Sequence, residues 1–219
     1  MGFPNFSFSY LIFFMLKLFL VRHGQTFWNV EKRIQGQAES DLTDEGIRQA
    51  QLLGMRLRGE VFDHIYVSPL RRTMQTLNAM AVSSSVPVTQ DERLMEIYMG
   101  DWQGKLVEDL KRDYPEEIDS FWHTPHKFYR ESCETYQEVY NRGVSFVRSL
   151  MSKHKSGVVL VITHGAFLKI LYTYFRYMQL YDVPLVDHPF STALSVVEWN
   201  GGLWNMLSWN DTIHLEAQF

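Results

Sequence analysis

Two short apolar runs, each followed by a histidine and a glycine, constrain the fold more than any other feature of this sequence. The first run covers residues 18–21 and stops at Arg22-His23-Gly24, and the second covers residues 158–162 and stops at Thr163-His164-Gly165. Short runs without polar interruption are typical of strands buried on both faces of a parallel sheet. Ligands of open α/β sheets bind beyond the carboxyl ends of the strands, so we expect chemistry where both runs stop.

Strand and helix signals alternate along the first half of the chain. Residues 64–67 are predicted to form another strand, followed by Ser68 as a helix N-cap and Pro69 at the first helical position. Residues 86–88 indicate a weaker strand. Thr43 can cap an earlier helix that has two acidic residues in its first turn, and the core face of that helix is predicted to carry Ile47, Ala50, Leu53 and Leu57.

The second half of the chain continues this pattern. The run that ends at Thr163-His164-Gly165 precedes an apolar helix, and residues 193–199 and 203–209 flank Asn200-Gly201-Gly202, which suits an antiparallel hairpin. A helix over 134–150 carries apolar or small residues at helical spacing, at Val139, Gly143, Phe146, Val147 and Leu150. Together these elements predict a three-layer α/β/α domain with a mostly parallel central sheet.

Two segments fall outside this regular alternation. Hydrophobic periodicity fades between residues 99 and 133, where aromatic and charged residues mix, and we expect a small helical and aromatic cap there. Residues 15–219 are expected to form one domain that includes this insertion, and residues 1–14 an apolar N-terminal extension of unknown role. The apolar stretch 6–21 is shorter than the ~20 residues that cross a bilayer and lacks a basic flank, so a cytoplasmic location without membrane attachment is expected.

Composition narrows the possible partners. The chain has 21 lysine and arginine residues against 25 aspartate and glutamate residues, which leaves no basic excess for a nucleic-acid backbone. The single cysteine, Cys133, cannot form an internal disulfide. His123 and His126 lack acidic or sulfur residues at a spacing that would complete a metal cage, so neither a metal nor another cofactor is expected. The expected partner is a small phosphorylated metabolite, and the sequence does not indicate an oligomeric state.

The residues at the strand ends suit phosphoryl chemistry. Arg22 lies at the first strand end and Arg72 near the start of the helix after residue 67, and guanidinium groups bind phosphate oxygens through two parallel hydrogen bonds. Neutral His23 can attack phosphorus with one ring nitrogen and form a phosphohistidine. His164 would stabilise charge on the equatorial oxygens, and Gly165 permits a close approach of the backbone. Glu96 is the candidate that protonates the departing oxygen and later activates water.

Four motifs in this order resemble those of the histidine phosphatase superfamily, also called the phosphoglycerate mutase-like family. They are Leu20-Val21-Arg22-His23-Gly24-Gln25-Thr26 with Asn29, Ser68-Pro69-Leu70-Arg71-Arg72 with Thr76, Glu96 followed by Gly100-Asp101-Trp102-Gln103-Gly104, and Ile162-Thr163-His164-Gly165. Each motif alone is a weak signal, but together, at the predicted strand ends, they are a strong one. The resemblance extends from about residue 17 to residue 209.

The resemblance implies roles for individual residues. His23 matches the histidine that is phosphorylated, and Arg22, Arg72 and His164 match the rest of the phosphate pocket. Asn29 matches a further phosphate contact, and Glu96 matches the acid. Two departures stand out: Cys133 occupies a position where the phosphatase branch commonly has glycine, and Arg71 lies beside Arg72, of which the spacing favours Arg72.

The leading hypothesis is a metal-independent phosphatase that hydrolyses small phosphomonoesters through a phosphohistidine intermediate. A cofactor-dependent phosphoglycerate mutase, an isomerase, is the alternative; such mutases carry a longer insertion between the acid and the second histidine, whereas Glu96 and His164 are 68 positions apart. An α-ribazole phosphatase and a non-catalytic module that binds a phosphorylated ligand are further alternatives. Substrate selection is expected from the cap and from residues around Gln35 and Gly36.

Overall fold

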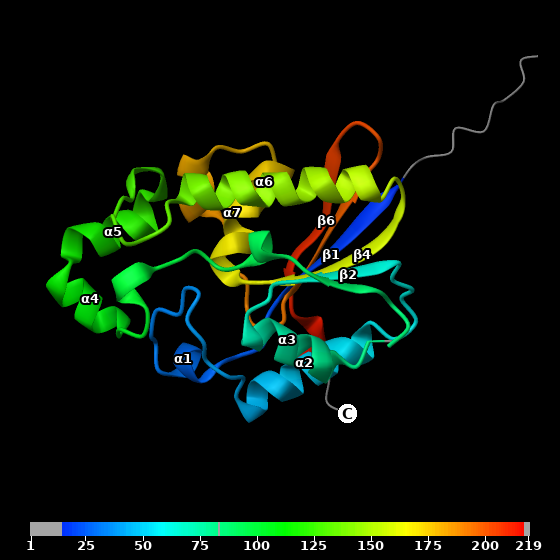
Figure 1. Cartoon of the computed structure of the whole chain (residues 1–219), viewed down its shortest axis with the longest axis horizontal. Coiled ribbons are helices and arrows are strands. Elements are labelled where there is room, and N and C mark those ends of the chain that lie inside the picture. Colours follow the sequence, from blue (N-terminus) through cyan, green and yellow to red (C-terminus); the bar gives the residue numbers. More distant parts are fainter. Residues whose placement is uncertain (1–14, 83, 217–219) are drawn as a thin grey trace, which may run out of the picture.

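A twisted six-stranded sheet with strand order β3-β2-β4-β1-β5-β6 forms the centre of the molecule (Figure 1). The computed structural model describes residues 15–82 and 84–216, so the extension expected at residues 1–14 lies outside the described residues. The pairs β3–β2, β2–β4 and β4–β1 are parallel, whereas β1–β5 and β5–β6 are antiparallel. The strands are β1 (Leu16–Arg22), β2 (His64–Val67), β3 (Val88–Gln90), β4 (Gly157–Thr163), β5 (Leu194–Trp199) and β6 (Trp204–Asp211).

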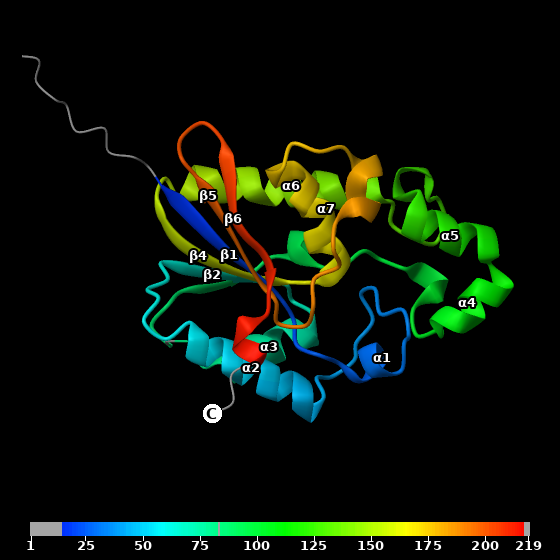
Figure 2. The ribbon, with the colours of Figure 1, turned by 180° about the vertical axis from the view of Figure 1, so that it is seen from behind.

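Helices cover both faces of this sheet. Figure 1 shows α6 and α7 on one face and α2 and α3 on the other, and the reverse view in Figure 2 shows the same layers. The predicted three-layer α/β fold with a mostly parallel sheet is therefore confirmed. The helices are α1 (Phe27–Val30), α2 (Asp44–Arg56), α3 (Arg71–Met80), α4 (Val107–Asp113), α5 (Pro115–His123), α6 (Tyr136–Lys153) and α7 (Gly165–Phe175). No helix among the described residues is long and apolar enough to cross a membrane.

Alternation along the central strands divides the core in two. In β1, Leu18 and Leu20 belong to the cluster that includes residues of α6 and α7, whereas Phe19 and Val21 belong to the cluster that includes residues of α2 and α3. Successive side chains of a strand point to opposite faces of the sheet, so a strand covered on both faces must be apolar at every position. This is why the run 18–21 has no polar interruption.

The register of the parallel strands brings their carboxyl ends to one level. Arg22 at the end of β1 pairs with Thr163 at the end of β4, and the backbone N–H of His23 donates to the carbonyl of Thr163 at 3.0 Å. On the other side of β4, the N–H of Ser68 donates to the carbonyl of Ile162, also at 3.0 Å. Three segments that are distant in the sequence therefore leave the sheet side by side.

Three details of the predicted elements are wrong. Ile47 is exposed, because the buried face of α2 runs through Gly46, Ala50 and Leu53, and a residue one position from Gly46 is rotated by about 100° around the helix. The weak strand expected at 86–88 begins instead at Val88, where it pairs with β2 as an edge strand.

The third difference concerns the start of α3. Ser68 is not its N-cap: the helix begins at Arg71, its N-cap is Leu70, and that cap forms no side-chain hydrogen bond. By contrast, Thr43 caps α2 through a hydrogen bond from the N–H of Gly46, and the hairpin of β5 and β6 lies where it was predicted.

The segment 99–133 forms α4, α5 and short turns at one end of the molecule, beside α1 (Figure 2). Its aromatic residues mainly pack against one another: the Trp102 ring is fully buried and lies 5.8 Å from the ring of Phe128 and 6.4 Å from that of Phe121. The backbone N–H of Val107 donates to the carbonyl of Lys32, which ties this segment to the loop that follows α1.

Candidate active site

A pocket of about 200 Å³ opens at the carboxyl ends of β1 and β4. Its lining comes from β1, the segment 28–36, α3, the loop that carries Glu96, the segment 99–133, α7 and the loop before β5. The sequence-predicted residues that line it are Arg22, His23, Asn29, Gln35, Gly36, Arg72 and Glu96. Parts of the chain that are far apart in sequence thus converge on one cavity.

His23 lies at the inner end of this pocket with one ring nitrogen engaged. Its Nδ1 lies 2.7 Å from the carbonyl oxygen of Gly24, and since a carbonyl only accepts, Nδ1 carries the hydrogen. Burial, together with the charges of Arg72 and Arg22, lowers the pKa of His23 well below its usual value. A neutral ring with hydrogen on Nδ1 has its lone pair on Nε2, which makes Nε2 the nucleophilic atom.

Arg72 is fully buried and held by three contacts. Its Nη1 donates to the carbonyl of Ala38 at 2.9 Å, its Nη2 to the carbonyl of Gly36 at 2.6 Å and its Nε to His164 Nδ1 at 3.2 Å. Each terminal nitrogen keeps one N–H for a ligand. Burial lowers the pKa of Arg72 to about 10, which still leaves it charged at neutral pH.

The neighbouring arginines differ from Arg72 in their surroundings. Arg71 is exposed and pairs with Asp41 on the surface, so only Arg72 of the two adjacent arginines lines the pocket. Arg22 reaches the pocket from the end of β1, and its Nη1 donates to the carbonyl of Pro189 at 2.6 Å. Its Nε is buried without a hydrogen-bond partner in the structure. The two guanidinium groups of Arg22 and Arg72 give the pocket two fixed positive charges.

His164 lies next to His23 and Arg72, but it is not among the residues that line the pocket. Its ring centre is 5.2 Å from that of His23, and it is fully buried. Nδ1 accepts from Arg72, so in the neutral ring Nε2 carries the hydrogen and donates to Ser68 Oγ at 2.8 Å. Burial and the charge of Arg72 lower the pKa of His164 well below its usual value. Both ring nitrogens of His164 are therefore hydrogen-bonded to side chains of the protein.

Gly165 does not line the pocket either, but its lack of a side chain is needed. A Cβ at this position would lie 2.7 Å from His188 Nε2 and 3.2 Å from Arg22 Nε. Both of these side chains line the pocket. Gly165 therefore makes room for pocket residues, which is a different use from the predicted backbone approach to a ligand.

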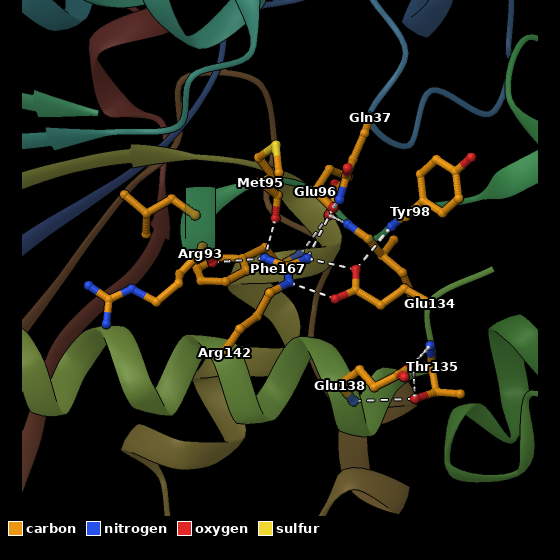
Figure 3. A network of polar contacts seen from close by, with 12 residues as sticks. Gln37, Arg93, Met95, Glu96, Tyr98, Glu134, Thr135, Glu138, Arg142 and Phe167 are labelled. Carbon is orange, nitrogen blue, oxygen red and sulfur yellow. Dashed lines mark hydrogen bonds and ion pairs between the residues drawn. The ribbon is translucent and has the colours of Figure 1, made fainter. Parts of the chain in front are cut away.

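Glu96 lies at the amino end of α7 with its carboxylate among backbone N–H groups. Oε1 accepts from Ile97 at 3.0 Å and Phe167 at 2.9 Å, and Oε2 accepts from Ala166 at 3.0 Å. Unpaired N–H groups at the start of a helix favour an anionic group there. Figure 3 shows Glu96 and the side chains around its loop. A carboxyl group at the pocket wall, fixed in this way, is suitably placed for proton transfer to a bound ligand.

The remaining predicted residues contribute in different ways. Asn29 Oδ1 accepts from the backbone and hydroxyl of Thr26 in the capping box of α1, which leaves its NH₂ group to donate into the pocket. Gln35 Oε1 is a buried acceptor without a hydrogen-bond partner. Gly36 has a φ of +56°, which favours glycine, and its carbonyl holds Arg72.

The segment 99–133, from which substrate selection was expected, contributes Met99 and Trp122 to the pocket, and with Trp28 they form an apolar wall. Trp28, Lys32 and His188 were not predicted from the sequence; Lys32, with a φ of +57°, adds a positive charge. His188 lies in the loop before β5; desolvation and the charges of Arg22 and Lys169 lower its pKa to about 3. Because β5 runs antiparallel to β1, the residues just before β5 lie beside the end of β1. An antiparallel pairing of the strand expected at 193–199 with the first strand would have pointed to this loop.

The part of the chain that the structure describes offers no ready metal site. Within residues 15–82 and 84–216, no group of three or more histidine, cysteine, aspartate or glutamate side chains lies together in an arrangement that holds a metal ion. His123 Nδ1 lies 2.7 Å from Asp119 Oδ1 on the surface of α5, and His123 is not among the residues that line the pocket. The pocket instead combines two guanidinium groups, a neutral imidazole and a carboxyl group, which can bind a phosphoryl group, attack it and protonate the group that leaves.

Comparisons with known proteins agree with this chemistry. Residues 18–212 match the family model described as "Histidine phosphatase superfamily (branch 1)". "Phosphoserine phosphatase 1" of Hydrogenobacter thermophilus is 37% identical over 158 residues, which is 72% of this chain and 75% of that protein. "Phosphoglycerate mutase-like protein 4" of Arabidopsis thaliana is 30% identical over 204 residues, or 91% of this chain and 87% of that protein. The structure of Bacillus stearothermophilus YhfR superposes with a TM-score of 0.88 at 34% identity, covering 91% of this chain and 99% of that one.

Proposed function

This chain belongs to branch 1 of the histidine phosphatase superfamily, and from that premise we propose that its pocket hydrolyses small phosphomonoesters through a phosphohistidine on His23. One observation carries the proposal: His23 Nδ1 is bound to the carbonyl of Gly24, and Nε2 is left as the nucleophile in a pocket with two arginines. Residues 15–219 act as one catalytic domain, and the insertion 99–133 supplies the outer part of the pocket.

In the first step His23 attacks the phosphorus of the bound monoester. The lone pair of Nε2 forms the P–N bond, the bond between phosphorus and the ester oxygen breaks, and Glu96 gives a proton to that oxygen so that an alcohol leaves. Arg22 and Arg72 donate to the phosphoryl oxygens and neutralise their charge. His164 keeps Arg72 oriented through Nδ1, and because Arg72 Nε can only donate, it fixes the tautomer in which His164 Nε2 donates to Ser68 Oγ.

In the second step water replaces the alcohol. Glu96, now a carboxylate, takes a proton from a water molecule, the water oxygen bonds to phosphorus, and the P–N bond breaks to release inorganic phosphate and neutral His23. The same carboxyl group thus acts first as an acid and then as a base, and both steps use it at one position near the amino end of α7.

We propose phosphoserine as the first substrate to test. The Hydrogenobacter relative is named for that substrate, and Lys32 at the pocket supplies positive charge for a carboxylate on the leaving group. A second candidate is a monoester with a larger aromatic leaving group, such as α-ribazole phosphate. The apolar wall of Trp28, Met99 and Trp122 favours that candidate, because indole rings stack on heteroaromatic rings.

The test uses the full chain and compares phosphate release from phosphoserine, α-ribazole phosphate and p-nitrophenyl phosphate with isomerisation of 3-phosphoglycerate. We expect the rate of phosphate release from each of these three monoesters to exceed the rate at which 3-phosphoglycerate is isomerised. Mutase turnover well above hydrolysis would contradict the phosphatase assignment in favour of the isomerase alternative.

The intermediate is tested separately with His23→Ala. Removal of the nucleophile should lower kcat by at least about 10⁴-fold and abolish acid-labile, base-stable protein phosphorylation, because the nitrogen that forms the P–N bond is lost. Circular dichroism checks that the variant is folded. A folded His23→Ala variant that retains turnover would show that His23 is not the nucleophile.

A further inference from the structure

We propose that Arg142, paired with Glu134, is a positioning residue that fixes the loop carrying Glu96, so that this carboxyl group meets the leaving oxygen. The inference rests on the proton-transfer role proposed for Glu96. Arg142 lies on α6 and does not line the pocket, and neither Arg142 nor Glu134 was a candidate from the sequence. The network they form is drawn in Figure 3.

Arg142 binds the backbone of the loop at Glu96 and just before it. Its Nη1 donates to the carbonyls of Arg93 at 2.8 Å and Met95 at 2.6 Å, and its Nη2 donates to the carbonyl of Glu96 itself at 3.0 Å. Three carbonyls of a four-residue stretch therefore converge on one guanidinium group. Lysine, with a single nitrogen, cannot reproduce this planar arrangement of donors.

Glu134 holds the guanidinium group in place. Arg142 Nε donates to Glu134 Oε1 at 2.7 Å and Nη2 donates to Oε2 at 2.9 Å, in a pair that is mostly shielded from solvent. Glu134 also binds the loop directly: its Oε2 accepts from the N–H of Tyr98 at 3.1 Å, and its own N–H donates to the carbonyl of Tyr98 at 2.8 Å. The segment from Arg93 to Tyr98 is thus fixed at both ends.

The same guanidinium group lies against the helix end that holds the Glu96 carboxylate. Arg142 Cζ is 5.3 Å from the centre of the Phe167 ring, and the backbone N–H of Phe167 donates to Glu96 Oε1. Arg142 therefore contacts both the backbone of Glu96 and the residue that binds its carboxyl group. Gln37 Nε2 also donates to the carbonyl of Glu96 at 3.0 Å, but Arg142 is the group that joins this backbone to α6, whereas His23, Arg22 and Arg72 are held by other partners.

This arrangement makes a selective prediction about substrates. An alkoxide such as that of serine leaves only with a proton, whereas p-nitrophenolate leaves without one, so misplacement of the acid slows the first substrate far more than the second. A residue that only stabilises the fold would lower both rates equally. The readout is the ratio of single-turnover rates of phosphohistidine formation from phosphoserine and p-nitrophenyl phosphate, which does not depend on the fraction of active protein.

We expect Arg142→Met and Glu134→Gln to slow phosphohistidine formation from phosphoserine by about 10²-fold and that from p-nitrophenyl phosphate by less than about fivefold. Arg142→Lys keeps the charge and the fold with fewer donors and should give a smaller shift of the same ratio. Arg148→Met, on an exposed position of α6, is the matched control and should leave both rates unchanged. Glu96→Gln calibrates the full effect of losing the acid.

The outcomes separate the two proposals. If Glu96→Gln changes the substrate ratio but Arg142→Met, Arg142→Lys and Glu134→Gln slow both substrates equally, or neither, the positioning role of Arg142 is overturned and the role of Glu96 stands. If Glu96→Gln itself leaves the ratio unchanged, the proton-transfer role fails and the positioning role fails with it.

Discussion

At the scale of single residues, the surroundings decide what identical side chains do. Arg71 and Arg72 are neighbours of the same type, yet Arg71 pairs with Asp41 in solvent and Arg72 is fully buried beside His164. The sequence spacing favoured Arg72, which is the one that lines the pocket. Spacing could not predict that His164 contacts Arg72 and Ser68, because these contacts depend on how distant segments pack together.

Arg72→Lys tests whether the geometry of the guanidinium group matters or only its charge. A lysine keeps the charge but loses the contacts to Ala38, Gly36 and His164 and the paired donors for phosphate, so kcat/KM should fall by about 10²-fold. Steady-state kinetics with phosphoserine provide the measurement. Arg71→Lys, the adjacent control, should stay within about twofold of the parent, because exposed ion pairs contribute little. Equal losses in the two variants would argue against the assignment of Arg72 to the phosphate.

At the scale of secondary-structure elements, the sequence was most informative where capping and periodicity coincide. The helix expected over 134–150 is α6, which begins with a capping box: the Thr135 hydroxyl accepts from the N–H of Glu138, and the Glu138 carboxylate accepts from the N–H of Thr135. The predicted start of α3 was wrong. Ser68 is placed like an N-cap in the sequence, but its hydroxyl binds His164 instead. Local signals cannot foresee a partner 96 residues away.

Thr135→Ala should lower the free energy of unfolding by about 1 kcal/mol, because an N–H at the start of α6 loses its partner. Urea denaturation followed by circular dichroism measures this loss. Glu138→Ala removes the other half of the capping box, and the double variant should be less destabilised than the two single changes combined. Simple additivity would mean that the two side chains do not act as one cap.

At the scale of the whole molecule, histidines make stability depend on pH. His23 and His164 are buried and their pKa values are lowered, and the pKa values of His188 and His214 are also lowered, to about 3 and about 4. The unfolded chain, with ordinary histidines near 6.5, therefore binds more protons than the folded protein at mildly acidic pH. The stability that these groups contribute is complete above pH 6.5 and is lost as the pH falls below it.

We therefore expect the free energy of unfolding to decrease between pH 6.5 and pH 5, with each of His23 and His164 contributing up to about 1.4 kcal/mol per pH unit. Urea titrations at a series of pH values measure the slope. His23→Gln, which cannot take up the proton, should make the slope shallower, and an exposed control, His123→Gln, should leave it unchanged. A stability independent of pH in this range would contradict neutral burial of these two rings.

The layered fold and the pocket followed from the strand-end motifs, because parallel strands force their carboxyl ends to one edge. The contributions of Trp28 and His188 to the pocket did not, because these residues reach it from segments without regular periodicity. The role of Arg142 could not be predicted either. Its helix was predicted, but its contacts depend on how α6 packs against the loop at Glu96.

Because the pocket forms where the carboxyl ends of separate strands meet, enzymatic activity requires the complete fold. His164 meets Arg72 and Ser68 across separations of 92 and 96 residues, so these contacts form only when β2, β4 and the helix after each are assembled together. A partly folded chain has none of this chemistry. Recovery of activity during refolding should accordingly follow the slowest tertiary step, and no truncated fragment that lacks β4 should turn over any substrate.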